Sequence, residues 1–363
     1  MVSEVQRQPA ERKYAAELSR LRENDSEAKP RGWQLSPRSV RRFILGDAKL
    51  DISQKFFGDD PLVDRCIVSL MGHQGLMLVG DPGTAKSLLS ELLAAAVSGT
   101  SDLVVQGSAG VLEDHLRYGW NYALLLAEGP SDKALVPSPV LSAMREGKIA
   151  RLEELTRCAP EVQDAMISLL SEKTISIPEL GPGQEVRAAP GFNVIGTANL
   201  RDRGVHDMSS ALKRRFNFET VMPIADPAFE RNLVARQVEE RMAEHESPVP
   251  LEENVVDVLV SVFRDLRTGV TDDGASVAMP NSVMSTAEAV NVAHAAVLDA
   301  MYLDGAKVST SHIAKQIRGV VFKDDPEDAR RFRSYIDQIV RTRMKGSKAW
   351  SEFYKAAKQD LDG

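Results

Sequence analysis

The sequence predicts an α/β domain, with a parallel sheet covered by helices on both faces, followed by an all-helical domain. Short apolar runs alternate with helical patterns up to about residue 225, which is typical of a parallel sheet. No strand pattern returns after Pro227. A length of 363 residues, with 43% hydrophobic and 27% charged residues, is ordinary for a globular chain of two domains.

Three regions follow from these patterns. Residues 1–45 are expected to form a charged helical arm, loosely attached over residues 1–30, and 46–225 and 226–363 are the α/β and helical domains. The predicted strands are Gly75–Val79, Leu103–Gln106, Ile149–Leu152 and Phe192–Ile195, with a helix over Ser87–Val97. The helices predicted for the last domain cover residues 228–245, 252–268, 283–302, 311–322, 327–344 and 348–360.

Composition excludes several classes of protein. Cys66 and Cys158 lie far apart without a CxxC motif, and the histidines form no HExxH motif, so neither a disulfide framework nor a zinc site is expected. No apolar run approaches the ~18 residues of a membrane helix. The charged N-terminus lacks the apolar segment of a signal peptide, so we expect a cytoplasmic protein with no membrane association.

Charge is distributed unevenly along the chain. The formal net charge is −7 although residues 1–45 are net positive, so the remainder is acidic and nonspecific nucleic-acid binding is not expected. The last helices are basic, which indicates a solvated face or, alternatively, a docking surface for an acidic partner. Their basic residues are Arg330, Arg331, Arg333, Arg341, Arg343, Lys345 and Lys348.

A phosphate-binding loop is predicted between the first strand and the helix that follows it. Its residues are Gly80, Asp81, Pro82, Gly83, Thr84, Ala85, Lys86 and Ser87. Backbone N–H groups at a helix N-terminus bind phosphate, and glycines let the backbone approach it closely. Lys86 is expected to reach the β- and γ-phosphates of ATP, and Ser87 to bind Mg²⁺. Ala85 stands where the motif has its last glycine, in a position expected to enter the helix already.

Two acids end the third predicted strand. Glu153 and Glu154 follow the apolar run that starts at Ile149, at the strand end where ligands gather in doubly wound sheets. We expect Glu153 to lie at the metal and Glu154 to orient or activate the attacking water.

Together these motifs resemble the MoxR family of AAA+ ATPases. The segment Glu153–Glu172 is similar to that family's Walker B motif and following helix, Phe192–Asn199 to its sensor 1 strand, and Ser210–Phe216 to its arginine-finger segment. The resemblance covers roughly residues 50–300. More narrowly, the chain is similar to the long MoxR branch thought to act with von Willebrand factor A proteins.

The resemblance implies a ring, a hexamer in this family, with ATP sites between subunits. Asn199 would be sensor 1, and Arg215, with Arg214 second, would be the finger supplied to a neighbouring site. Residues Val111–Gly129, which look helical, would belong to an insert facing the ring's pore, although their aromatic rings are expected in the core. Thr174–Ile177 and Glu185–Ala188 would form the hairpin before sensor 1.

Two departures from the family are visible. The Walker B acid is usually Asp, and Glu153 is longer by one methylene, about 1.5 Å, which is expected to slow hydrolysis because Mg²⁺ demands near-ideal geometry. Ala287 stands where the sensor 2 arginine is sought, so no sensor 2 residue is assigned.

Three functions therefore remain open. The first is an ATP-driven, chaperone-like remodeller of a partner protein, with metal insertion into a von Willebrand factor A protein as one form of it. The second in order of preference is a nucleotide-binding switch without hydrolysis, which Glu153 and the missing sensor 2 arginine favour. The third is a helicase-like motor, since Gly80–Ser87 also resembles the loop of minichromosome maintenance helicases, but the acidic body and the lack of a DNA-binding domain count against it.

Overall fold

The expected α/β fold followed by a helical domain is present in the computed structural model. It describes residues 7–199, 204–243, 245, 249–282, 284–305, 307–323 and 325–362. The chain divides into two compact units, one of residues 1–81 and 85–221, the other of residues 82–84 and 222–363.

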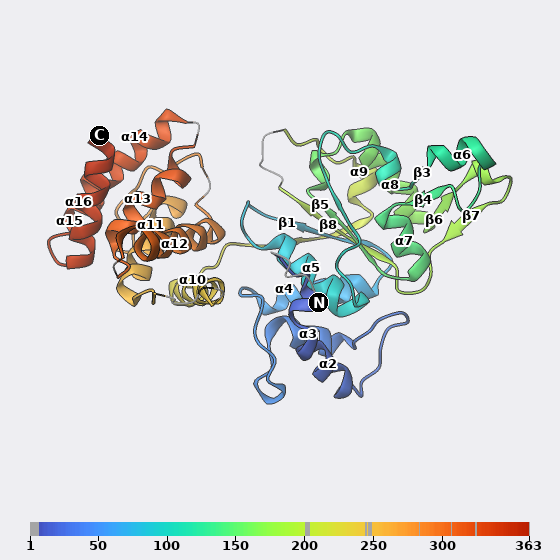
Figure 1. Ribbon diagram of the computed structural model, residues 1–363, viewed down its shortest axis with the longest axis horizontal. Helices are drawn as coiled ribbons and strands as arrows, with labels where there is room; N and C mark the ends of the chain where they lie inside the picture. The colour runs from blue at the N-terminus through green and yellow to red at the C-terminus, as the bar shows by residue number, and fades with distance from the viewer. Residues whose placement is uncertain are drawn as a thin grey trace. The chain divides into compact units, whose positions relative to one another are not determined.

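The first unit is built on a parallel sheet (Figure 1). In the described part of the chain its strands lie in the order β2 (Val104–Gln106), β5 (Ile149–Glu153), β8 (Asn193–Ala198), β1 (Gly75–Val79) and β9 (Phe216–Thr220). All neighbouring pairs are parallel, with Leu76 of β1 opposite Ile195 of β8 and Gly75 opposite Phe216 of β9. The predicted strands are thus confirmed, whereas β9 was not predicted from its short alternating run.

Alternating side chains of strand β1 pack into two separate cores, one on each face of the sheet. Leu76 and Leu78 of β1 join the core that contains α3 (Pro37–Leu45), α4 (Asp60–Met71) and α5 (Lys86–Ser98). Met77 and Val79 point to the opposite core, which contains α7 (Pro139–Glu146), α8 (Pro160–Glu172) and α9 (Ser210–Lys213). Because strand side chains alternate with a period of two, each helical layer receives every second residue.

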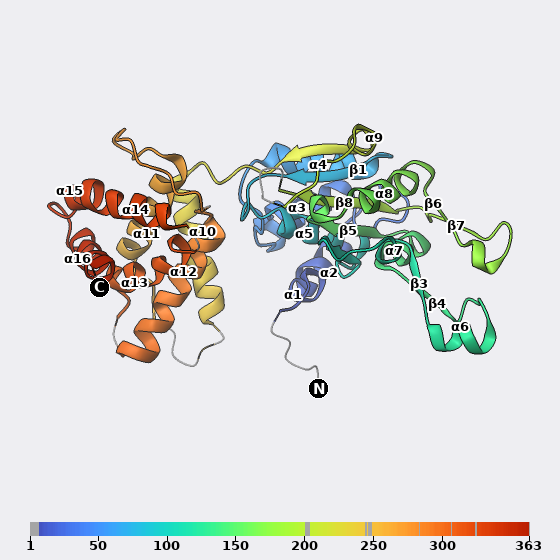
Figure 2. The ribbon, with the colours of Figure 1, turned by 90° about the horizontal axis from the view of Figure 1, so that it is seen from above.

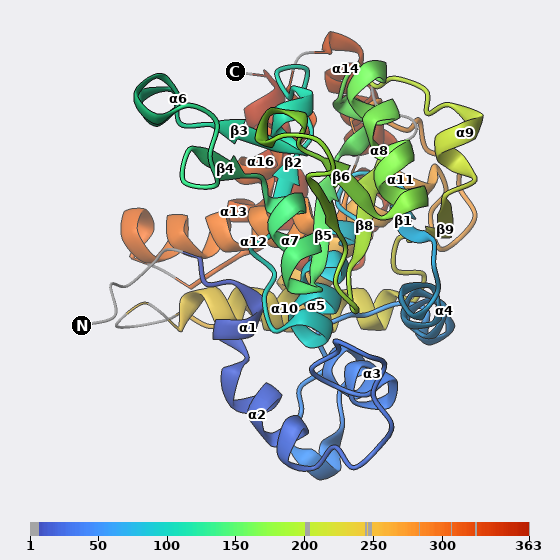
Figure 3. The same ribbon diagram turned by 90° about the vertical axis from the view of Figure 1, so that its right-hand side faces the viewer.

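The expected loose attachment of the N-terminal arm is wrong for the residues described. Helices α1 (Ala10–Lys13) and α2 (Ala15–Glu23) belong to the same core as α3 and α5, and Leu18 and Leu21 are each 1% exposed. Figures 1 and 3 show α2 and α3 side by side. The apolar spacing in this charged segment is short, so its buried face was not recognised in the sequence.

Buried polar contacts also hold the N-terminal segment. The Ala10 N–H donates to Oε1 of Glu91 in α5 (3.0 Å), and Glu17 of α2 pairs with Nζ of Lys55 at 2.5 Å. The Lys55 side chain is only 1% exposed, and its Nζ also donates to the carbonyls of Phe43 (2.9 Å) and Ser53 (2.8 Å). A buried ammonium is tolerated only when it is paired and hydrogen-bonded, so α2 and its glutamate are part of the folded unit.

Two hairpins project from the same side of the first unit (Figure 2). The predicted hairpin before β8 is confirmed, because β6 (Thr174–Ser176) pairs antiparallel with β7 (Glu185–Arg187). The continuous helix expected over 111–129 is wrong: β3 (Tyr118–Trp120) pairs antiparallel with β4 (Leu135–Pro137), and only α6 (Tyr122–Glu128) is α-helical. Aromatic residues around Gly119 favour a strand over a helix at this point.

The aromatic residues of this insert have different surroundings. Tyr118 is buried and donates its hydroxyl to Oε2 of Glu179 (2.8 Å), and its ring contacts the Trp120 ring edge-on. Tyr122 on α6 is 71% exposed, and Leu126 is 88% exposed. The expectation that aromatic rings lie in the core therefore holds for Tyr118 but not for Tyr122.

The second unit is helical, as predicted. Its helices are α10 (Pro227–Met242), α11 (Glu253–Thr268), α12 (Thr286–Asp299), α13 (Thr310–Val321), α14 (Pro326–Tyr335), α15 (Arg341–Arg343) and α16 (Lys348–Asp362). Glu230 of α10 is fully buried and accepts hydrogen bonds from Arg267 (2.7 Å) and Thr286 (2.6 Å), which ties α10, α11 and α12 together.

Several basic residues of the last helices are paired with acids inside the second unit. Arg343 contacts Oδ2 of the buried Asp265 at 2.7 Å, and Arg331 contacts Asp328 at 3.2 Å. Arg330 pairs with Glu327 at 2.5 Å. The Arg330 pair lies on a solvated face, whereas Arg331 and Arg343 bind acids that are buried in the unit.

Two further findings concern the described residues. None of their helices is both long enough and apolar enough to cross a membrane.

Cys66 and Cys158 are buried thiols, and burial raises the pKa of Cys66 to about 12, so this thiol is inert at neutral pH.

Substitution of Glu17 tests the attachment of the N-terminal helices. Glu17→Ala leaves the Lys55 ammonium buried without its carboxylate, so we expect the unfolding free energy to fall by about 3 kcal/mol. The matched control is Glu23→Ala, which removes an exposed carboxylate from the same helix and is expected to change stability by less than about 0.5 kcal/mol. Urea unfolding followed by tryptophan fluorescence measures both, and equal effects would contradict the packing described.

Candidate functional site

The loop between β1 and α5 forms a left-handed backbone turn. Gly80, Gly83 and Ala85 have φ of 153°, 75° and 67°. Ala85 precedes the first residue of α5 and is not yet helical, contrary to the expectation for this residue. A β-carbon in this conformation costs about 1–2 kcal/mol, which explains why the motif has glycine here. The turn and the N-terminus of a 13-residue helix together suit an anionic phosphate.

The two side chains assigned to phosphate and metal have protein partners in this structure. Lys86 is buried, and its Nζ donates to the carbonyls of Gly80 (3.0 Å) and Asp81 (2.7 Å). Ser87 Oγ donates to Oε2 of Glu153 at 2.7 Å. The two residues that were each expected at the metal thus lie in contact, and both offer hard oxygen atoms, the ligand type that Mg²⁺ prefers.

The Glu153 carboxylate is the centre of the site. It ends β5 at 4% exposure, and its Oε2 also accepts from Thr197 Oγ1 of β8 (2.8 Å). Its Oε1 accepts from Ser90 Oγ (2.5 Å) and from Nη2 of Arg151 (2.7 Å). Burial alone raises the pKa of Glu153, but the charge of Arg151 and the three hydroxyls lower it on balance. The group is therefore ionised at neutral pH.

Arg151 is a site residue that the sequence analysis missed. It lies two residues before Glu153 on the same face of β5, and only 7% of it is exposed. Its guanidinium donates from Nε to Ser90 Oγ (3.0 Å), from Nη1 to the Ser101 carbonyl (3.0 Å) and from Nη2 to the Ser87 carbonyl (3.2 Å). The signal was present in the sequence, because a charged residue interrupts an otherwise apolar strand.

Glu154 occupies a different environment from Glu153. Its backbone is left-handed, with φ of 54°, and its N–H donates to Thr197 Oγ1 (2.9 Å). Its side chain is 37% exposed, and Oε2 pairs with Nε of Arg157 at 2.5 Å. Thr197 thus connects the two adjacent acids, while Arg157 holds the second carboxylate. A non-glycine residue in this conformation is strained, and such strain is concentrated at functional sites.

Asn199 follows β8, between the loop strand β1 and the acid strand β5. Its side-chain Oδ1 is buried and has no hydrogen-bond partner among the residues that the structure describes. A buried acceptor without a donor costs about 1–3 kcal/mol, so this atom fits a site that is completed by water or a ligand. The Asn199 oxygen, the loop geometry and the Ser87–Glu153 pair are together chemically compatible with a nucleotide and its metal.

The two candidate finger residues differ in their contacts. Arg215 donates from Nη1 to the Ala211 carbonyl (2.5 Å) and from Nε to Ser171 Oγ, which anchors it within its own chain. Arg214 is exposed, and its backbone carbonyl accepts from Nε2 of Gln74 (2.8 Å). No hydrogen bond between described residues joins either arginine side chain to Lys86, Ser87, Glu153 or Glu154.

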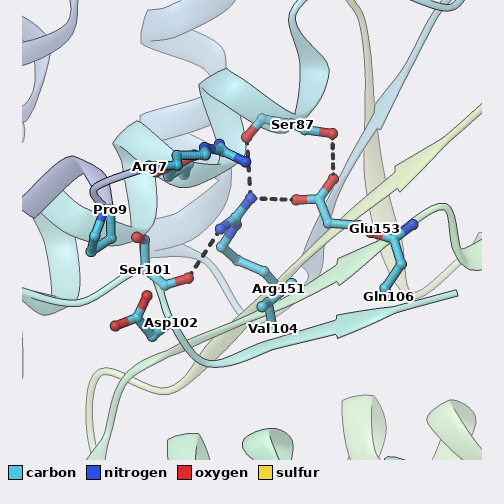
Figure 4. Close-up of a pocket in the computed structure, with 10 residues that line it drawn as sticks. Arg7, Pro9, Ser87, Ser101, Asp102, Val104, Gln106, Arg151 and Glu153 are labelled. Atoms are coloured by element: carbon cyan, nitrogen blue, oxygen red, sulfur yellow. Dashed lines mark hydrogen bonds and ion pairs between the residues drawn. The ribbon is translucent and has the colours of Figure 1, made fainter. Parts of the chain in front are cut away.

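A cavity of about 430 Å³ lies beside Arg151 and Glu153 (Figure 4). It opens between the N-terminal segment, the start of α5 and strands β2 and β5. The residues that line it are Arg7, Pro9, Ser87, Glu91, Ser101, Asp102, Val104, Gln106, Arg151 and Glu153. Figure 4 shows the Arg151 guanidinium bridging Ser101, Ser87 and Glu153.

Both units match known protein families. Residues 75–216 match the AAA domain of the dynein-related subfamily, and residues 228–360 match the YehL-like AAA+ ATPase C-terminal domain. The uncharacterized protein YehL of Escherichia coli (strain K12) is 47% identical over 353 residues, which is 97% of each chain. The uncharacterized protein SH1500 of Staphylococcus haemolyticus is 31% identical over 144 residues, 40% of this chain and 54% of that protein.

Solved structures give a more distant likeness. The RuvB Holliday junction branch migration motor of Thermotoga maritima is 14% identical, with a TM-score of 0.46, over 84% of this chain and 88% of its own.

Removal of the central carboxylate tests its structural role. Glu153→Ala leaves the Arg151 guanidinium buried without its counter-charge, so we expect a loss of about 3–5 kcal/mol in unfolding free energy. Glu154→Ala is the adjacent control, because its ion pair with Arg157 is exposed to solvent and contributes about 0–1 kcal/mol. Urea unfolding curves compare the two, and similar losses would refute the central role assigned to Glu153.

Proposed function

Because this chain belongs to the YehL family of AAA+ ATPases, we propose that it binds ATP with Mg²⁺ at Gly80–Ser87 and hydrolyses it. The observation that carries the proposal is the pairing of a left-handed loop at the start of α5 with the buried, ionised Glu153 beside Ser87. An anion-binding loop and a carboxylate at the adjacent strand end are the parts that phosphoryl transfer requires.

Each residue has a distinct role in this proposal. Lys86 exchanges its carbonyl partners for phosphate oxygens, and Ser87 and Glu153 hold Mg²⁺, which neutralises charge on the phosphates when it is bound. Glu154 accepts a proton from the attacking water. Asn199 orients that water through its unpaired amide oxygen. For Glu154 to act as a base, its carboxylate must be at least partly released from Arg157.

We propose that the active form is a homo-oligomeric ring, a hexamer as in the MoxR family that the motifs resemble. An arginine from one subunit would then complete the site of the next. The exposure of Arg214 supports it as the donor, since Arg215 is bound by Ser171 and Ala211. A ring can also free Arg215 by displacing these two contacts, so the test covers both arginines.

The proposed target is a partner protein in the cytoplasm, remodelled in a chaperone-like reaction. A von Willebrand factor A protein, with metal insertion as one outcome, is the candidate that the MoxR resemblance suggests. Helix α6 supports a protein target, because Tyr122 and Leu126 are exposed and apolar. No Lys or Arg occurs in Tyr122–Glu128 or in the hairpin turn of residues 177–184. A surface that binds along a nucleic-acid backbone needs positive charges, so these two segments suit a protein better than a nucleic acid.

A nucleotide-binding switch without hydrolysis is the second candidate. Two observations favour it: Arg151 neutralises the metal-binding acid, and Arg157 holds the carboxylate of the proposed base. A helicase-like motor ranks below both, for the reasons of charge given above.

Substitution of Glu154 separates binding from chemistry. Glu154→Gln keeps the size of the side chain but cannot accept the proton, so we expect ATP binding to persist and turnover to fall by about 10²–10⁴-fold. Thermal shift measures binding: at 100 times its Kd, ATP–Mg should stabilise the protein by ~2.7 kcal/mol. Lys86→Ala is the control that should lose this shift. ATP bound but never hydrolysed by the unaltered protein would favour the switch.

A mixing experiment tests whether the site is shared. Arg214→Ala and Arg215→Ala are each expected to bind ATP, and the variant that removes the finger should lose about 10³–10⁵-fold in rate. Mixing that variant with Lys86→Ala subunits should restore part of the activity, because an intact pocket then meets an intact finger. If subunits exchange but no mixture recovers activity, the finger acts within its own chain. Full activity of a monomer would exclude the ring.

A further inference from the structure

The buried guanidinium of Arg151 is fixed beside the metal-binding acid. Its Nε, Nη1 and Nη2 all donate to protein acceptors, on α5, on the segment before β2 and on Glu153 itself. Figure 4 shows the contacts with Ser87, Ser101 and Glu153. A planar guanidinium held at three nitrogens cannot turn away without losing several buried hydrogen bonds at once. Arginine also stays protonated in proteins, so this positive charge is permanent.

The charge of Arg151 acts on one oxygen of Glu153. The guanidinium and Ser90 bind Oε1, while Oε2 is left with Ser87 and Thr197. The carboxylate therefore presents a single oxygen to the Ser87 side, and its negative charge is balanced by Arg151 at 2.7 Å. Opposite charges this close cancel much of each other's field at a third charge.

The length of Glu153 fits the same arrangement. An aspartate at this position is shorter by one methylene, about 1.5 Å, and could not keep the contacts of both oxygens with Arg151 on one side and Ser87 on the other. Glu153 and Arg151 thus form one unit, in which the length of the acid lets one oxygen contact the guanidinium while the other contacts Ser87.

We propose that Arg151 is a positioning residue that directs Glu153 toward Ser87 and weakens the dependence of nucleotide binding on Mg²⁺. A divalent cation approaching Ser87 meets a carboxylate whose charge is already balanced, so it gains less than it would from an unpaired acid. This inference rests on the proposed function, since it assumes that nucleotide binds at Gly80–Ser87.

The readout is nucleotide affinity rather than turnover. ADP binding is measured by calorimetry in Mg²⁺ and in EDTA. The dissociation constant in EDTA divided by that in Mg²⁺ reports how strongly binding depends on Mg²⁺. We expect Arg151→Met to raise this ratio about tenfold over the unaltered protein, because the balancing charge is gone. Arg151→Lys keeps the charge and should stay close to the original ratio. Arg41→Met, which removes a surface ion pair with Asp64 from the same unit, is the matched control.

The outcomes separate this inference from the proposed function. An unchanged or lower ratio in Arg151→Met, with ADP still bound, overturns the role of Arg151 and leaves nucleotide binding intact. If the unaltered protein binds no ADP in either condition, the proposed function itself fails. An Arg151→Lys ratio that rises as far as that of Arg151→Met overturns the charge argument.

A second measurement remains available if Arg151→Met folds poorly. Glu153→Asp should lower the melting temperature more in the unaltered background than in an Arg151→Gln background, because the shorter acid breaks the pair only where the guanidinium is present. Equal losses in both backgrounds would contradict the idea that the two residues form one unit.

Discussion

The nucleotide-binding unit depends on one buried carboxylate. Glu153 receives hydrogen bonds from α5, from β8 and from its own strand, so a single side chain fixes how the start of α5, β8 and β5 meet. Such a group is costly to bury and is tolerated only because each oxygen has more than one donor. The same network ties the first turns of α5 to β5, since Ser87 and Ser90 both donate to this acid.

The position of the acid within the sheet gives the site its shape. Strand β8 lies between β1 and β5, so Asn199, the loop and the two glutamates all emerge at the carboxyl ends of neighbouring strands. Ligands in open α/β sheets bind at this edge. Thr197 lies on strand β8, two residues before Asn199. Its hydroxyl donates to Glu153 and accepts from the N–H of Glu154, so one side chain links the two acids.

The sequence was informative where a local pattern decides the structure. The loop Gly80–Ser87, strand β1 and the helices of the second unit follow from glycine spacing, apolar runs and helical periodicity, and all are present. The packing of α1 and α2 could not be predicted in this way, because it depends on Lys55 and Glu91, which are distant in sequence. The role of Arg151 was hidden for a similar reason: its partners Ser87, Ser90 and Ser101 come together only when α5 lies on β5. The strand at Tyr118–Trp120 was not predicted because the residues it pairs with, Leu135–Pro137, lie beyond helix α6 in the sequence.

The packing of the N-terminal helices has a consequence for the size of the smallest autonomous ATPase unit. The match to the AAA domain begins at residue 75, but the core beneath the sheet includes Leu18, Leu35 and Phe43 as well as Leu76 and Leu89. A fragment cut at the limits of the conserved domain would expose the apolar underside of α5 and leave Glu91 without the Ala10 N–H. Exposed surface of this kind promotes aggregation. The unit that folds is therefore larger than the matched AAA domain of residues 75–216, because the first helices complete the core on one face of its sheet.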